Sequence, residues 1–140
     1  MAKRFIFATV LGSETLKVKG KRTDLSGERC PIARALGCVG DPWSLLIVRD
    51  AARGSRRFGE FQKGLGVAKN ILADRLRKLV AIGVLDVQPS SEGGSRNCYV
   101  LTEKGERLRL VLRALGEWGE SFTVAPDETP HRVIGSAHET

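Results

Sequence analysis

The sequence predicts a mainly α-helical domain that carries a single small β-hairpin. Two observations predict this fold class: apolar residues recur at helical spacing through most of residues 30–122, and the period changes to two after Gly83. A chain of 140 residues suits one domain and is long enough to bury a core. We therefore divide the chain into an N-terminal arm (1–29), a helical domain (30–122) and a C-terminal tail (123–140) with two prolines and little periodicity.

The N-terminal arm begins with basic residues and a short apolar stretch from Phe5 to Gly12. We expect no secretory signal here, because the stretch is marginal in length, lacks a small-x-small cleavage site and runs into further basic residues. The segments RFIFATVL and TLKVK are rich in β-forming residues. The arm therefore forms either a hairpin turned at GSE or an extension with no fixed fold.

Three helices are predicted in the first half of the domain. The first, CPIARALGCVGD, opens on a proline, which suits the first helical position. In the second, DPWSLLIVRDAARG, Asp41 is the expected N-cap and Gly54 follows the end. This helix is apolar nearly all round from Trp43 to Val48, so we expect it to be the central buried helix. The third, RFGEFQKGLG, is expected to stop at Gly64 and Gly66.

A fourth helix is predicted from about Ala68 to Ile82, directly after these glycines. Its apolar stripe, which we expect to be buried, consists of Ala68, Leu72, Leu76, Leu79 and Val80. The opposite face carries Asn70, Ala73, Asp74, Arg77 and Lys78, with Lys69 in the first turn.

The second half of the domain changes period and then returns to helix. The segments VLDVQ and NCYVL predict two strands, joined by PSSEGGSR, which is too long for a tight turn. Thr102 is the expected N-cap of a fifth helix. That helix carries a long apolar stripe of Leu108, Val111, Leu112, Leu115, Trp118 and Phe122.

This order of elements is that of a winged helix-turn-helix. A helix about 10–12 Å wide fits the major groove of DNA, while the helix before it crosses the backbone. Taken alone, the polar face of the fourth helix is more typical of an ordinary solvated surface. The glycine break before it and the hairpin after it favour DNA binding. We therefore predict DNA contacts by Lys69, Asn70, Ala73, Arg77, Lys78, Arg96, Arg56 and Arg57.

Roles within this set follow from position. Lys69 and Asn70 are predicted to contact base edges, and Arg77 and Lys78 to contact phosphates. Arg96, on the Gly/Ser-rich hairpin loop, is predicted to touch the backbone or the minor groove. The alternative for Arg96 is an ordinary solvated turn residue.

The stripe on the last helix exceeds what one small domain needs for its core. Left in water, each large apolar side chain would forgo about 1.5–3 kcal/mol of burial. We expect a homodimer with an interface of Ile32, Leu36, Leu108, Val111, Leu115, Trp118 and Phe122. Two-fold symmetry would place two recognition helices about 34 Å apart, matching a palindromic site. The alternative is that the last helix folds back over its own hairpin.

From Cys30 to Trp118 the chain resembles the HxlR-type winged helix-turn-helix regulators, relatives of the MarR group. The resemblance rests on CPIARAL, GDPWSLLIVRD, RRFGEFQKGLG, LADRLRKLVAIGVL, YVLTEKGERL and LGEWG, in the family's order and spacing. It implies a homodimer that binds DNA and regulates transcription, which we expect to be a repressor. The chain departs from the pattern at Pro42, often basic in the family, at Ala68, often Ser, and in the hairpin loop.

Cys30 lies just before Pro31, at the expected N-cap of the first helix, where the helix terminus favours a thiolate. It also aligns with a cysteine that some HxlR-type regulators use to sense oxidants or electrophiles. The resemblance therefore implies a redox sensor at Cys30. The alternative is a small residue packed near the dimer seam. Cys38 and Cys98 are expected to be structural.

Composition limits the partners. A net charge of +7 and a pI of about 9.8 favour an anionic partner, here double-stranded DNA, without naming it. Three cysteines with no close pairing favour a reducing, cytoplasmic compartment. No apolar run approaches the roughly 20 residues of a membrane span, so we expect no membrane partner.

Other chemistry is sparse. Both histidines lie in the tail, and the cysteines lack the close pairs of a zinc site. We therefore expect no enzyme, no metal and no cofactor. A small-molecule or oxidant effector remains an expected partner. The alternative function is a winged-helix interaction module that binds a protein or RNA partner.

Overall fold

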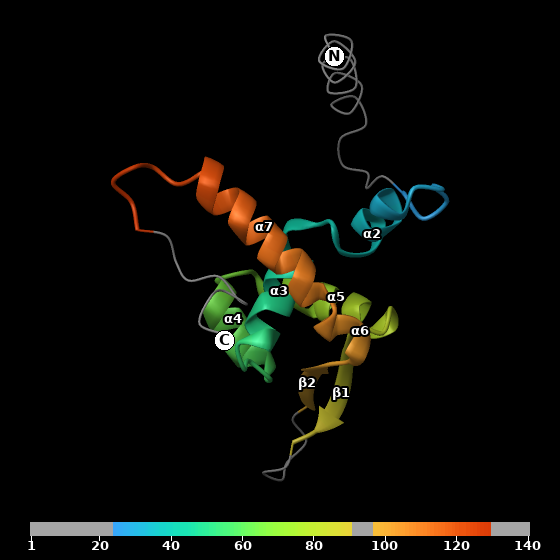
Figure 1. Ribbon diagram of the computed structural model, residues 1–140. Coiled ribbons are helices and arrows are strands. Elements are labelled where there is room, and N and C mark those ends of the chain that lie inside the picture. Colours follow the sequence, from blue (N-terminus) through green and yellow to red (C-terminus); the bar gives the residue numbers. More distant parts are fainter. Residues whose placement is uncertain (1–23, 91–96, 130–140) are drawn as a thin grey trace. The chain divides into compact units, whose positions relative to one another are not determined.

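The computed structural model describes residues 24–90 and 97–129 (Figure 1). Both alternatives for the arm fall mainly on residues 1–23, and Arg96 falls on the hairpin loop, so these predictions lie outside the described residues. The chain forms two compact units, one up to Cys38 and one from Val39 onward.

The first unit contains α2 (Pro31–Val39), whose last residue opens the second unit. Pro31 is the first helical residue, as predicted. The segment before α2 turns back on itself: the Glu28 amide donates to the Leu25 carbonyl at 3.1 Å, and the Arg34 guanidinium donates to the Glu28 carbonyl. Leu25 packs beside α2, since a Cβ on Gly37 would lie 3.3 Å from the Leu25 Cβ.

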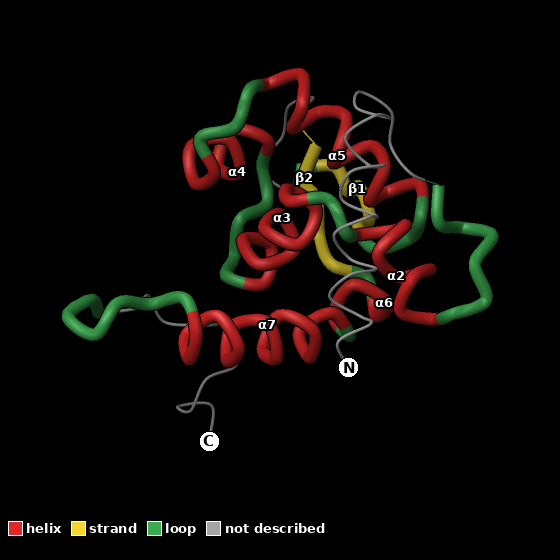
Figure 2. Tube along the Cα trace, turned by 90° about the horizontal axis from the view of Figure 1, so that it is seen from above, coloured by secondary structure: helices red, strands yellow, loops and turns green. Residues whose placement is uncertain are grey.

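The second unit contains a helical cluster and a hairpin (Figures 1 and 2). Its elements in chain order are α3 (Pro42–Ala52), α4 (Phe58–Leu65), α5 (Lys69–Ala81), β1 (Leu85–Pro89), β2 (Asn97–Leu101), α6 (Glu103–Glu106) and α7 (Leu108–Phe122). The predicted fifth helix is therefore divided at Arg107. This is the winged helix-turn-helix order, and the predicted fold class is confirmed, while the dimer remains a proposal.

The core lies around α3, which contacts α4, α5, α7 and β2. Ile47 and Val48 of α3 are fully buried, as are Phe61 of α4 and Leu72, Leu76 and Leu79 of α5. The central position predicted for α3 is confirmed. Two predictions for α5 need correction: Val80 is only half-buried, and Ala68 is exposed because it is the extended N-cap residue rather than part of the helix.

Two glycines shape α4 and its exit. Gly66 ends the helix with φ of 66°, a left-handed conformation that glycine adopts at little cost. Gly64, predicted to stop the helix, instead lies within it. A Cβ at Gly64 would lie 2.8 Å from Oδ2 of Asp50, so this glycine permits the close approach of α4 to α3.

The hairpin pairs its two strands antiparallel, from Leu85 opposite Leu101 to Pro89 opposite Asn97. The Tyr99 amide also donates to the Arg56 carbonyl at 2.7 Å, which joins β2 to the segment before α4. Thr102 caps α6 as predicted, since its hydroxyl accepts from the Gly105 amide at 3.1 Å.

Candidate nucleic-acid interface

The entry to α4 is fixed by Glu60. Its Oε1 accepts from the backbone amides of Arg56 and Arg57 at 2.7 and 3.1 Å. These two hydrogen bonds, aided by the nearby guanidinium charges, hold the pKa of Glu60 below its usual value. The chain then passes Gly66 and the buried Val67 into α5. Local hydrogen bonds therefore set the start of α4, and one glycine sets its end at the turn into α5.

The outer face of α5 is polar and basic. The helix contains four basic residues against one acidic residue, Asp74. Lys69, Asn70 and Arg77 are exposed, as the sequence predicts for DNA-contacting groups, and the Arg77 side chain is 72% accessible. Ala73, also predicted to face DNA, is half-buried. It borders a hollow of about 350 Å³ between α5 and the hairpin, which Arg77 also lines.

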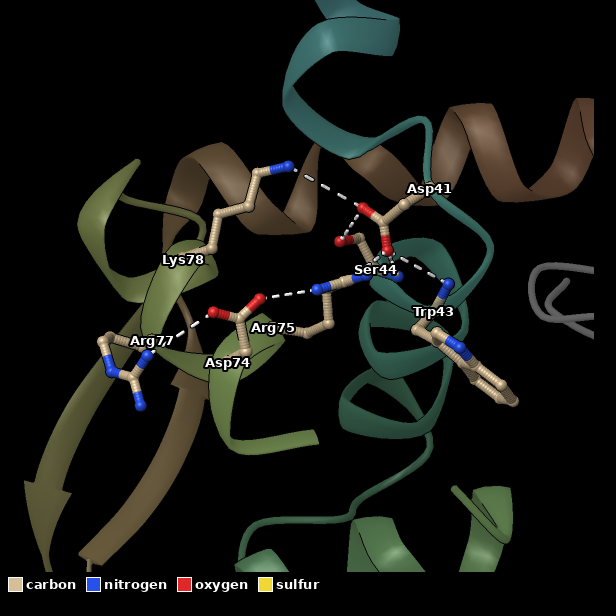
Figure 3. Close-up of polar contacts among 7 residues, drawn as sticks. All are labelled: Asp41, Trp43, Ser44, Asp74, Arg75, Arg77 and Lys78. Atoms are coloured by element: carbon tan, nitrogen blue, oxygen red, sulfur yellow. Dashed lines mark hydrogen bonds and ion pairs between the residues drawn. The ribbon is translucent and has the colours of Figure 1, made fainter. Parts of the chain in front are cut away.

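Asp41 connects the start of α3 to α5 (Figure 3). Its Oδ2 accepts from the amides of Trp43 and Ser44 at 3.2 and 3.0 Å and from Nε of Arg75 at 2.9 Å. Its Oδ1 accepts from the Ser44 hydroxyl at 2.6 Å. The predicted N-cap is therefore confirmed, and it also holds Arg75 of α5.

Burial, the largest single influence, would raise the pKa of the Asp41 carboxyl. The hydrogen bonds from Ser44 and Arg75 and the positive charge of Arg75 together outweigh it, so the pKa lies below its usual value. Only 6% of this side chain is accessible to solvent. Asp41 is therefore a carboxylate held charged inside the fold.

Lys78 differs from the prediction. The sequence places it on the outward face, but its side chain is 24% accessible and its Nζ lies 3.8 Å from Oδ1 of Asp41. Figure 3 shows Lys78 directed toward Asp41 and Arg77 directed away from it. Lys78 therefore lies on the flank of α5 that faces α3, and Arg77 is the more available cation.

Asp74 extends the Asp41 contacts onto the exposed surface. Its Oδ2 accepts from Nη1 of Arg75 at 2.5 Å, and its Oδ1 lies 3.5 Å from Nη1 of Arg77. Arg75 thus contacts a buried carboxylate through Nε and an exposed one through Nη1. No role was predicted for Arg75 or Asp74 from the sequence. The acidic residue directly followed by basic ones in ADRLRK was the available signal, but the partner at Asp41 is distant in sequence.

Arg56 and Arg57 lie at the start of α4. The Arg56 Nη1 donates to the carbonyls of Ala51 and Ser55, both at 3.1 Å. The Arg57 Nη2 donates to the Ser90 hydroxyl at 3.1 Å, which links this arginine to the end of β1. Both guanidiniums therefore also make contacts within the domain, at the start of α4, the helix predicted to cross the DNA backbone.

The predicted dimer residues are mostly uncovered in the single chain. No residue of α7 is fully buried. Trp118 and Phe122 are 61% and 73% accessible, and their rings pack together with centroids 5.5 Å apart. Leu108 is an exception, since it packs against the domain's own core. The large apolar residues exposed on these two helices are Leu110, which was not among the predicted residues, Val111, Leu115, Trp118 and Phe122 on α7, and Ile32 and Leu36 on α2.

The cysteines do not all match their predicted environments. Cys30 is exposed at the start of α2, and Cys98 is half-buried in β2. Cys38, expected to be structural, is exposed and therefore does not pack in a core. Among the described residues no His, Cys, Asp and Glu side chains cluster as a metal site would require. No helix in the described part of the chain is both long enough and apolar enough to cross a bilayer.

Three packed helices, a glycine-ended turn, an exposed basic helix and a paired hairpin define a winged helix-turn-helix protein. The chain belongs to the HxlR-like helix-turn-helix family, whose model matches residues 38–127. The predicted family is thereby confirmed.

Individual relatives agree with this membership. An uncharacterised HTH-type transcriptional regulator of Mycobacterium tuberculosis is 40% identical over 102 residues, which are 73% of this chain and 65% of that protein. The crystal structure of PA1607, a candidate transcription factor, is 53% identical with a TM-score of 0.74, covering 79% of this chain and 77% of that one. The reduced form of the redox regulator HypR is 29% identical with a TM-score of 0.59, covering 66% and 92%.

Proposed function

We propose that the protein is a sequence-specific transcriptional regulator that binds a palindromic operator as a homodimer and acts as a repressor. The observation that carries this proposal is α5: an exposed basic helix that follows a glycine-ended turn and precedes a hairpin, in a chain of the HxlR-like family. Such a helix is suited to the major groove. In this proposal residues 30–122 bind DNA and dimerise, and residues 1–29 and 123–140 are the arm and the tail.

The proposed contacts divide by position on the domain. Lys69 and Asn70, in the exposed first turn of α5, reach base edges, and Arg77 reaches a phosphate. Arg56 and Arg57 at the start of α4 bind phosphates, as does Lys78 from the flank of α5 when DNA competes with Asp41. Ala73 offers a small apolar contact beside them, and Arg96 follows the backbone or minor groove from the hairpin loop.

The DNA proposal is tested with the chain's own upstream promoter duplex, titrated across a salt series beside a scrambled duplex. We expect the protein to bind the promoter duplex more tightly than the scrambled one. We also expect its affinity to fall steeply as the salt concentration rises. Asn70→Ala should lose the preference, whereas the matched control Gln88→Ala, an exposed amide on β1, should keep it. Equal affinity for both duplexes would instead support the alternative, a module that binds protein or RNA.

The homodimer proposal stands on the exposed apolar residues of α7 and α2. Covering Trp118, Phe122 and Leu115 with a second copy would remove a large apolar surface from water. Light scattering of the full chain at low micromolar concentration should give twice the chain mass. Trp118→Glu should lower the measured mass toward that of the monomer. Val87→Thr, which changes an exposed apolar residue of the hairpin, should leave the mass unchanged. A monomer in the unaltered chain would contradict the dimer.

We also propose oxidant sensing through Cys30, because this cysteine is exposed at the start of α2 and a redox regulator is among the similar structures. Hydrogen peroxide should lower operator affinity, and a thiol reductant should restore it. Cys30→Ser should abolish the response, and Cys38→Ser should retain it. A response that persists in Cys30→Ser would exclude this role, in which case a small-molecule effector becomes the alternative.

A further inference from the structure

One carboxylate lies on the surface of α5 that the proposed function turns toward DNA. Asp74 is 55% accessible, between Asn70 one turn before it and Arg77 three residues after it. A carboxylate close to DNA phosphates weakens binding to any sequence. Asp74 therefore does not increase the affinity of this helix for DNA, and we look for its role in the choice of DNA sequence.

Asp74 is also held in place. The Arg75 guanidinium donates from Nη1 to Oδ2 of Asp74, and the same guanidinium is anchored through Nε by the buried Asp41. The guanidinium has a fixed planar geometry, so anchoring one nitrogen orients the other. Figure 3 shows Arg75 lying between the two carboxylates. The exposed carboxylate is thus pre-oriented by a contact with the fold rather than freely rotating.

The second carboxylate oxygen of Asp74, Oδ1, faces Arg77 instead of Arg75. Oδ1 of Asp74 lies 3.5 Å from Nη1 of Arg77, at the long limit of a hydrogen bond, and Arg77 is itself largely exposed. A carboxylate oxygen accepts more than one hydrogen bond. Oδ1 therefore retains capacity to accept from a donor that approaches the outer face of α5.

We propose that Asp74 is a specificity-determining residue that accepts a hydrogen bond from the N4 amino group of a cytosine in the major groove. This inference rests on the proposed function and deepens it. Among major-groove edges, only cytosine and adenine present an amino donor, whereas guanine and thymine present acceptors that repel a carboxylate. Adenine places its N7 acceptor beside the amino group, so cytosine is the better partner. Arg75 and Asp41 are positioning residues for this contact.

The test is binding-site selection from a randomised duplex library with the full-length protein. The unaltered chain should select a motif with cytosine at one symmetric position in each half-site. Asp74→Asn should reduce the preference for cytosine there by about 5- to 150-fold, the range for one good base contact. It should also bind scrambled DNA more tightly, because one negative charge is removed. Asp86→Asn, an exposed carboxylate on β1, is the matched control and should retain the motif.

The positioning role has its own readout. Arg75→Lys keeps the charge but loses the fork, so the cytosine preference should fall while affinity for scrambled DNA changes little. Thermal unfolding of each variant checks that the domain remains folded. If Asp74→Asn selects the same motif as the unaltered chain, the inference is overturned and the proposed function stands. If the unaltered chain selects no motif, both fail.

Discussion

Arg75 and Asp41 lie 34 positions apart in the sequence, yet Nε of Arg75 is 2.9 Å from Oδ2 of Asp41. The arginine side chain is 19% accessible and the aspartate side chain 6%, so this ion pair is largely shielded from water. One carboxylate therefore both caps α3 and restrains α5. Losing it should affect the start of one helix and the orientation of another at the same time.

Asp41→Ala should lower the free energy of unfolding by about 2–4 kcal/mol. Loss of a helix cap costs about 1 kcal/mol, and removing the buried partner of the mostly buried Arg75, which keeps only the exposed Asp74, adds the remainder. Urea unfolding followed by circular dichroism measures the change. Asp86→Ala removes an exposed aspartate from β1 and should stay within about 0.5 kcal/mol of the unaltered chain. Equal effects of the two substitutions would show that Asp41 contributes nothing beyond an ordinary surface charge.

Stability should fall in acid partly through Asp41. Its pKa in the folded chain is lowered from 3.8, so the folded state binds the proton less readily than the unfolded state. The stabilisation is fully present above pH 3.8 and is lost as the pH falls through the lower, folded-state value. Unfolding free energies measured from neutral pH down to strong acid should decline less steeply in Asp41→Asn than in the unaltered chain. Parallel curves for both proteins would contradict this assignment.

Gly105 and Gly59 should respond oppositely to alanine. A Cβ at Gly105 would lie 2.3 Å from the Val84 carbonyl oxygen and 2.9 Å from Cδ2 of Leu101. Gly105→Ala should therefore destabilise by about 2 kcal/mol or more, because a backbone atom must move. Gly59, in α4, has nothing within 4 Å of its Cβ position, so Gly59→Ala should stabilise by about 0.5–1 kcal/mol. Melting temperatures that shift in the same direction would refute this contrast.

Arg77 and Lys78 should contribute unequally to DNA binding. Arg77 is largely exposed, while Lys78 faces Asp41, so only Arg77 is free of a buried competitor. Arg77→Ala should reduce the slope of log affinity against log salt by about one, and Lys78→Ala should reduce it less. Fluorescence anisotropy across a salt series measures both slopes. A larger loss in Lys78→Ala than in Arg77→Ala would contradict the unequal contributions expected from the burial of Lys78.

Local signals predicted much of this fold. Asp41 and Thr102 were identifiable as caps because each precedes a helical pattern with a side chain that accepts from the first turn. The three fully buried residues of α5 were identifiable from their spacing, and the hairpin from the change to a period of two. These features depend on neighbours within a few residues.

The failures come from contacts between distant segments. Gly64 was expected to end α4, but it lies within the helix, where its lack of a side chain lets Asp50 of α3 come close. Lys78 was placed facing outward, but a carboxylate 37 residues earlier draws it to the flank of the helix. The contact of Arg75 with Asp41, and so the orientation of Asp74, was equally invisible to periodicity. Sequence patterns therefore predicted the helix proposed to contact DNA but not the arrangement of charges on it.

The contrast between the two tryptophans would allow fluorescence to test the proposed dimer. Trp43 packs against the core, whereas Trp118 stands largely in water beside Phe122. In Trp43→Phe, emission would come from Trp118 alone, since the chain contains no other tryptophan. A blue shift of that emission as concentration rises would trace the covering of α7 without any attached dye, and its midpoint would give the strength of the association.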